Sequence, residues 1–257
     1  MDLKLTGKTA LIAASTGGLG LAVATALAAE GANVVITGRR ADRARDIAGT
    51  LPHAVGIAAD LGTEAGIDAA FNGAVNAFGP IDILVLNGPG PKPGAAAALS
   101  SDDIGSAFDL LVKPQHALVS RALPGMRSRR WGRILALGSS GVVAPLPNLA
   151  VSNIGRAALA GYLKTLAAEV ALDEVTVNML LPGRIQTDRV GELDLAAAKR
   201  RGTTIDAIQQ ESRSSIPARR YGDPAEFGAA AAFLCSGPAS YITGVALRCD
   251  GGLIRSL

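Results

Sequence analysis

Short runs of β-branched and other apolar residues alternate with longer alanine-rich stretches along almost the whole chain. This alternation is typical of β-α-β units, in which each parallel strand is followed by a helix that crosses back over the sheet. The apolar runs predict seven strands, at Thr9–Ala13, Asn33–Thr37, Ala54–Ala58, Ile81–Leu86, Arg133–Leu137, Val175–Leu181 and Ala246–Cys249. The longer stretches predict helices near Leu19–Glu30, Asp102–Arg127, Asn153–Leu172 and Pro224–Leu234.

These elements indicate an α/β protein with a single-domain Rossmann fold over residues 1–257, in which a doubly wound seven-stranded parallel sheet carries helices on both faces. The least regular segment, residues 188–217, is rich in charge and is interrupted by Gly191 and Gly202. It follows a strand at the carboxyl edge of the sheet, where open α/β sheets bind their ligands. We therefore expect a substrate lid there, with a disordered loop as the alternative.

Composition limits the classes of partner. The net charge is only +3, and the densest basic run, from Arg127 to Arg133, is expected to be a solvated loop because no nucleic-acid recognition module accompanies it. Cys235 and Cys249 are far apart and form no C-x-x-C, so neither a disulfide framework nor a metal site is expected. No signal peptide or membrane-length apolar run is visible, which favours a cytoplasmic protein without a membrane partner.

A glycine-rich turn, Ala-Ser-Thr-Gly-Gly-Leu-Gly over residues 14–20, joins the first strand to the first helix. Such a turn lets a pyrophosphate approach backbone N–H groups and the positive end of the helix. The cofactor-binding candidates in this turn are Ser15, Thr16, Gly18, Leu19 and Gly20. Ala14 is expected to hold its position only with a negative φ. The alternative is a tight turn without a ligand.

Four further motifs follow in order: Asp60-Leu61, Asn87-Gly88, Pro182-Gly-Arg-Ile-Gln-Thr187, and Tyr241-Ile-Thr-Gly with Asp250-Gly-Gly. Together with the glycine turn they cover residues 5–253 and resemble the short-chain dehydrogenase/reductase family, single-domain Rossmann oxidoreductases. Ala14 stands where that family has the first glycine of Thr-Gly-x-x-x-Gly-x-Gly. Leu86, Pro89 and Gly90 depart from the family's Asn-Asn-Ala-Gly around Asn87-Gly88.

The resemblance implies how a nicotinamide cofactor is held. Asp60, beside Leu61, would contact the adenine amino group, and Asn87-Gly88 would lie along the cofactor. The nicotinamide would be cradled by Pro182, Gly183, Ile185 and Thr187. Arg39 and Arg40 follow the second strand, where an acidic residue would bind the ribose of NAD and an arginine favours the 2′-phosphate of NADPH. We therefore expect NADPH, with a pair of solvated arginines as the alternative.

The reaction end departs from the family. The resemblance implies an Asn, a Ser, a Tyr and a Lys acting together, and only Ser139 keeps its residue type. Leu111 stands at the Asn position, and Ser152 and Arg156 stand at the positions of Tyr and Lys. Arg156 is expected to bind ribose hydroxyls but cannot act as a proton reservoir at neutral pH. Ser152 either holds a water molecule, or it or Asn153 caps the helix.

Other candidate acids are few. His116 and Lys113 lie three residues apart on one predicted helix, so one of them is a candidate to face the cleft. Tyr221 and Arg184 lie near the predicted lid without spacing that supports a role.

Together these residues favour an NADPH-dependent reductase that transfers a hydride to a carbonyl or conjugated enone of a small molecule without the usual tyrosine acid. The alternative is a catalytically degenerate relative that binds the nucleotide and acts by association or sensing. A redox-neutral isomerase or dehydratase ranks last, because no paired carboxylates are expected in the cleft. The resemblance also implies a homodimer or homotetramer, with the predicted helix Asn153–Leu172 at the interface.

Overall fold

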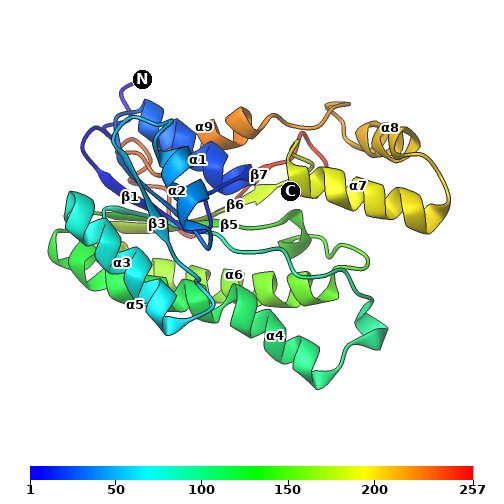
Figure 1. Ribbon diagram of the computed structural model, residues 1–257, viewed down its shortest axis with the longest axis horizontal. Helices are drawn as coiled ribbons and strands as arrows, with labels where there is room; N and C mark the ends of the chain where they lie inside the picture. The colour runs from blue at the N-terminus through cyan, green and yellow to red at the C-terminus, as the bar shows by residue number, and fades with distance from the viewer. Residues whose placement is uncertain (257) are drawn as a thin grey trace.

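The computed structural model describes residues 1–256 and contains a sheet of seven parallel strands in the order β3-β2-β1-β4-β5-β6-β7 (Figure 1). The strands are β1 (Thr9–Ile12), β2 (Asn33–Gly38), β3 (Ala54–Ala58), β4 (Ile83–Leu86), β5 (Gly132–Leu137), β6 (Val175–Pro182) and β7 (Ala246–Cys249). Every predicted strand is present, with ends shifted by two residues at most. The doubly wound Rossmann-type sheet is therefore confirmed.

Helices cover both faces of the sheet (Figure 1). One face carries α1 (Gly18–Ala29), α2 (Ala41–Ala48) and α9 (Pro224–Leu234), and the other carries α3 (Glu64–Phe78), α5 (Lys113–Ser128) and α6 (Ala150–Val170). Successive strand residues alternate between the two cores: Ala10 and Ile12 pack under α1 and α9, whereas Leu11 and Ala13 join the opposite core. Burial on both faces explains why these strands read as continuous apolar runs.

The predicted helix Asp102–Arg127 is two helices, α4 (Ser101–Leu111) and α5, separated at Val112. Pro114 lies in the first turn of α5, a position that proline favours because its missing N–H group has no partner there in any case, and it therefore favours a helix start at this point. Leu111 consequently ends α4 instead of lying inside a continuous helix.

The prediction of an irregular segment at 188–217 was wrong. It forms α7 (Asp188–Arg201) and α8 (Ile205–Ser215), which project beyond the carboxyl edge of the sheet (Figure 1). Gly202 ends α7 in the left-handed conformation, and Thr204 caps α8. Gly202 therefore marks the end of one helix and Thr204 marks the start of the next. Helices α2 and α3 were also absent from the prediction, and short 3-10 turns occur at Ala96–Ala98, Ser140–Val142 and Ala171–Asp173.

The basic run after α5 is held by the protein itself. Arg127 pairs with Asp173 at 2.6 Å and Arg130 pairs with Glu174 at 2.9 Å, while Arg133 is buried. Residues 127–130 stay exposed, in line with the expected solvated loop, whereas the buried Arg133 anchors the amino end of β5. Among residues 1–256, no helix combines the length and the apolar character that crossing a bilayer requires.

Candidate active site

The turn after β1 is built around Ser15, whose side chain is fully buried. Its hydroxyl donates to the carbonyl of Ile12 at 2.8 Å and accepts from the N–H of Thr37 at 3.0 Å, and its own N–H donates to the carbonyl of Thr37. All of these partners lie on β1 and β2. Ser15 therefore fixes the turn against the sheet, and its polar groups are used before any ligand arrives.

Ala14 adopts a positive φ of 47°, so the expectation of a negative φ was wrong. Its N–H donates to the hydroxyl of Thr37 at 3.0 Å, and its carbonyl accepts from the side-chain amide of Asn87 at 3.0 Å. These two bonds keep an alanine in a conformation that costs an L-residue about 1–2 kcal/mol. The turn thus keeps the glycine geometry of the family at a local cost in strain.

The amino end of α1 is open to a ligand. Gly17 precedes the helix without a side-chain cap, and no acidic residue lies in the first turn. Gly18 has a φ of 56°, is exposed, and would leave free space even around a Cβ atom. Gly20 is different, because a Cβ there would lie 2.8 Å from the Ala14 carbonyl. Unsatisfied helix N–H groups beside accessible backbone fit the pyrophosphate of a dinucleotide.

Cationic side chains surround the end of β2. Thr16 packs against Gly38, the last residue of that strand, and the following residues, Arg39 and Arg40, are exposed. Sequence reasoning missed Arg43, which lies on α2 and donates from Nε to the Thr16 carbonyl at 3.0 Å. The signal was the presence of a third arginine three residues beyond Arg40. This group fits a phosphate at the 2′ position of an adenosine ribose.

The middle of the cofactor site lies beyond β3 and β4. Asp60 is exposed, is followed by the partly buried Leu61, and accepts from the N–H of Gly62. The side-chain amide of Asn87 donates to the Ala14 carbonyl in the glycine turn, while the backbone carbonyl of Asn87 accepts from the buried side chain of Gln115 at 3.1 Å. The other polar atom of Gln115, Oε1, is buried without a partner. Gln115 also lies against Gly88, and no motif pointed to it.

The segment after β6 is held close to β7. Gly183 donates to the Cys249 carbonyl at 3.0 Å, and a Cβ at residue 183 would collide with Asp250 at 2.7 Å. Ile185 is buried and forms a bridge with Gly222, while Thr187 caps α7. Pro182 to Thr187 are therefore held in place at the carboxyl edge of the sheet, and their contact with a nicotinamide stays a prediction.

Ser139 and Arg156 meet at the end of β5. The Ser139 hydroxyl accepts from the N–H of Gly141 at 3.0 Å, which leaves its hydrogen available to donate. Arg156 donates from Nη1 to the carbonyls of Leu137 and Gly138, at 2.9 and 3.2 Å. The structure therefore brings a free hydroxyl and a fixed cation to the same strand end.

The capping interpretation of Ser152 was wrong. Helix α6 begins at Ala150, so Ser152 is already its third residue, and Leu149 precedes the helix without a side-chain cap. The Ser152 hydroxyl instead accepts from Nε of Arg156 at 3.3 Å. Asn153 is no cap either, because its side chain bonds both the N–H and the carbonyl of Leu146.

Leu111, at the position that the resemblance gives to Asn, packs against Gly155 next to Arg156. The other candidates lie elsewhere. Lys113 is exposed and pairs with Asp109 at 2.6 Å, and the exposed His116 stacks on Tyr162 with ring centroids 5.6 Å apart. The prediction that one of them faces the cleft was wrong, because both side chains point to the outer surface of α5.

Helix α7 is anchored by Asp194, whose side chain is buried. Its carboxylate accepts from Arg184 at 2.7 Å and from the Tyr221 hydroxyl at 2.9 Å. This assigns Tyr221 and Arg184 a structural role. At the other end of α7, Arg189 donates to the carbonyl of Pro91 at 3.2 Å, which joins this helix to the loop after β4.

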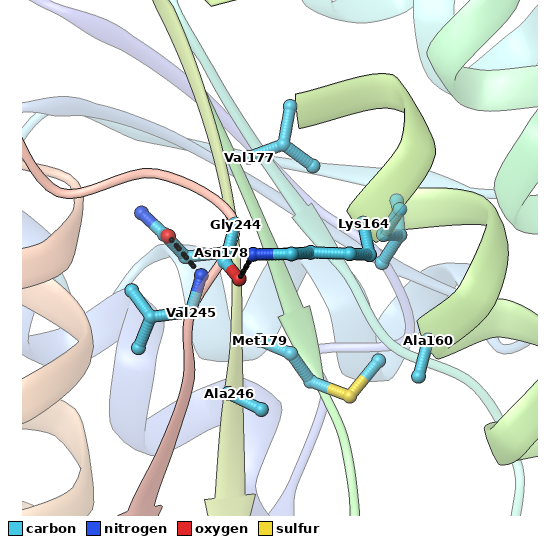
Figure 2. A pocket seen from close by; sticks show the side chains of 9 residues that line it. Ala160, Lys164, Val177, Asn178, Met179, Gly244, Val245 and Ala246 are labelled. Atoms are coloured by element: carbon cyan, nitrogen blue, oxygen red, sulfur yellow. Dashed lines mark hydrogen bonds between the residues drawn. The ribbon is translucent and has the colours of Figure 1, made fainter. Parts of the chain in front are cut away.

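Two cavities lie away from these groups. The smaller, of about 180 Å³, lies between α6 and β6, where Lys164 reaches across to the Gly244 carbonyl at 2.7 Å (Figure 2). The larger, of about 450 Å³, is lined by Ala150, Asn153 and Ile154 of α6 together with residues 95–96 and 145–148 of two loops. The lining of neither cavity includes Ser139, Ser152 or Arg156.

Comparison with known proteins places this geometry in a family. A family model described as enoyl-(acyl carrier protein) reductase matches residues 13–254. The 3-oxoacyl-[acyl-carrier-protein] reductase FabG of Aquifex aeolicus is 34% identical over 98% of this chain and its own full length. L-sorbose reductase of Gluconobacter frateurii, solved with NADPH and L-sorbose, is 32% identical, with a TM-score of 0.93 and full coverage of both chains.

A 3-ketoacyl-(acyl-carrier-protein) reductase of Brucella melitensis, solved with NADH, is 34% identical with a TM-score of 0.85, over 97% of this chain and 99% of its own. The matches extend over nearly the whole chain. The chain therefore belongs to the short-chain dehydrogenase/reductase family.

Proposed function

We propose that this protein is an NADPH-dependent reductase that acts on a conjugated C=C bond, or less efficiently on a carbonyl, of a small molecule. The observation that carries the proposal is the Ser139 hydroxyl, which has a hydrogen free to donate and lies beside the fixed charge of Arg156. When bound, NADPH supplies a hydride. Ser139 then stabilises the negative charge that develops on the substrate oxygen by donating a hydrogen bond to it.

No tyrosine is near Ser139 to act as the acid. The chain has three tyrosines. Tyr162 stacks on His116, Tyr221 donates its hydroxyl to Asp194, and Tyr241 is fully exposed. A reaction that forms an enolate suits this arrangement, because an enolate need not be protonated on oxygen at once. The proton comes from water in this proposal, and direct ketone reduction loses the roughly 10²–10⁴-fold contribution of a general acid.

Preference for NADPH rests on Arg39 and Arg43 beside Thr16. The acid nearest to them on α2, Asp42, pairs with Arg45 instead, and no ion pair is formed by Arg39 or Arg43 in the described part of the chain, which leaves both available for a 2′-phosphate. The relative solved with NADPH supports this preference, whereas the relative solved with NADH means that the fold alone does not decide it. Helices α7 and α8 are proposed as the substrate lid, with Asp194 as the anchor.

Titration with NADPH and NADH, followed by the emission of the nicotinamide, tests the proposal. Quenching of Trp131 is a poor signal, because Trp131 precedes β5, whose six residues place it about 20 Å from the carboxyl edge. We expect tighter binding of NADPH, followed by NADPH consumption with one or more members of a panel of enones and ketones. Absence of binding by either cofactor contradicts the proposal, and binding without turnover favours the nucleotide-sensing alternative.

A further inference from the structure

Arg156 carries a desolvated positive charge whose hydrogen-bond partners are all neutral. They are the carbonyls of Leu137 and Gly138 and the hydroxyl of Ser152. Burial lowers the pKa of Arg156, and no carboxylate in the described part of the chain acts on it in the opposite direction. Removing a charge from water without a counter-ion is costly, so a nearby anion would be bound favourably.

Arg133 gives an internal comparison, because its guanidinium is also buried and also donates to backbone carbonyls. Two groups compensate the charge of Arg133. Trp131 presents its ring face 4.5 Å from the guanidinium carbon. Burial lowers the pKa of Arg133, as it does that of Arg156, but at Arg133 the Glu174 carboxylate acts in the opposite direction. Arg133 therefore has groups within the protein that offset its charge and serves a structural role, whereas Arg156 has no corresponding negative partner.

The phosphates of the cofactor do not supply that partner. The glycine turn follows β1, while Arg156 binds the end of β5, and β4 lies between these two strands. Two strand spacings correspond to about 10 Å. The groups that fit phosphates are Arg39, Arg43 and the amino end of α1, on the β1–β2 side. The missing anion must therefore come from the other reactant.

We propose that Arg156 and Ser152 together bind a carboxylate of the substrate, which makes the substrate a small carboxylic acid whose reducible double bond lies close to that carboxylate. The proposal rests on the reductase function above. Nη2 of Arg156 makes no hydrogen bond within residues 1–256, and the Ser152 hydroxyl accepts from Nε, so its hydrogen is free. These donors match the two oxygens of a carboxylate. Ser139 remains available for the reacting oxygen or for the enolate derived from it.

The test measures binding, so it does not depend on turnover. The protein saturated with NADP⁺ is titrated calorimetrically with a panel of unsaturated and keto acids, including but-2-enoate, cinnamate and pyruvate, and with the corresponding uncharged amides. We expect at least one acid to bind ten or more times more tightly than its amide. Arg156→Gln should remove that difference and Ser152→Ala should reduce it severalfold. The dissociation constant of NADPH should change less than twofold in Ser152→Ala.

Lys113→Gln is the matched control, since it removes one exposed positive charge far from the site and should leave the difference intact. Equal binding of every acid and its amide, or no binding of any acid, overturns the proposal while leaving the cofactor titration as a separate test of the reductase function. If Arg156→Gln weakens NADPH at least tenfold and leaves carboxylate binding unchanged, the guanidinium binds the cofactor ribose instead. Ser152→Ala keeps the test decisive if Arg156→Gln fails to fold.

Discussion

The two halves of the sheet depart from the family in different ways. In the cofactor half, around β1 and β2, Ala14 replaces a glycine, yet its carbonyl and N–H bonds hold the turn in the same left-handed geometry. In the reaction half, around β5 and α6, the chain keeps the backbone geometry but carries Ser152 and Arg156 in place of a phenol and an amine.

The difference shows that backbone strain can be compensated by neighbouring hydrogen bonds, whereas the loss of a reactive side chain cannot. Surrounding hydrogen bonds can offset a backbone cost of about 1–2 kcal/mol, as they do at Ala14. No packing arrangement turns a serine hydroxyl into a tyrosine acid or an arginine into a proton reservoir at neutral pH. The cofactor half is therefore compatible with the proposed NADPH binding, whereas for the reaction half we propose a changed mechanism or substrate.

The largest expected effect concerns Ser139, the residue that the reaction half shares with the family. Ser139→Ala removes the hydroxyl proposed to stabilise the developing oxyanion, and turnover should fall roughly 100-fold. The dissociation constant of NADPH should stay nearly unchanged, since the assigned phosphate contacts lie at the other end of the site. Steady-state kinetics with the best substrate of the enone and ketone panel, together with a cofactor titration, gives both values. Unchanged turnover removes Ser139 from the mechanism.

The next effect tests the cofactor half. Arg39→Asp should lower the preference for NADPH over NADH at least tenfold, because a charge-assisted hydrogen bond is replaced by repulsion of the 2′-phosphate. Arg43→Gln should lower the same preference by a smaller factor, and Arg45→Gln, in an exposed ion pair on the same helix, serves as control. An unaltered preference in both Arg39→Asp and Arg43→Gln excludes this end of β2 as the phosphate site.

A smaller effect measures the strain at Ala14. Ala14→Gly should raise the free energy of unfolding by roughly 0.5–1 kcal/mol, because relief of the positive φ exceeds the added entropy of an unfolded glycine. Ala13→Gly, at the neighbouring buried position, should lower it by about 1 kcal/mol or more. Urea denaturation monitored by circular dichroism compares the two variants. Destabilisation of similar size in both would mean that the turn stores no strain.

The smallest effect separates the two roles considered for Ser152. Because Ser152 lies inside α6 and caps nothing, Ser152→Ala should change the free energy of unfolding by less than about 0.5 kcal/mol. Ser100→Ala removes a true capping box at the start of α4 and should cost about 1 kcal/mol, which makes it the matched control. Equal losses in the two variants would restore the capping role.

Much of the architecture follows from local sequence. Seven apolar runs fix seven buried strands because a parallel sheet covered on both faces admits few polar residues. The glycine turn and the Pro182–Thr187 segment are also local, since close backbone approach at Gly20 and Gly183 leaves no room for a side chain. Pro114 marks the boundary between α4 and α5, and sequence reasoning missed it. Helices α7 and α8 were missed because they carry many charged, exposed residues, and α7 is anchored by the buried Asp194.

What the sequence determined by itself is the order of the seven strands along the chain, the helical regions near residues 19–30, 102–127, 153–172 and 224–234, and the family. Tertiary structure decided which side chains meet. It joined Arg43 to Thr16, separated His116 from the cleft, and brought Arg156 to neutral carbonyls without a carboxylate. The physical reason is that local patterns record backbone propensity and burial, whereas the charge environment of a side chain depends on elements distant along the chain.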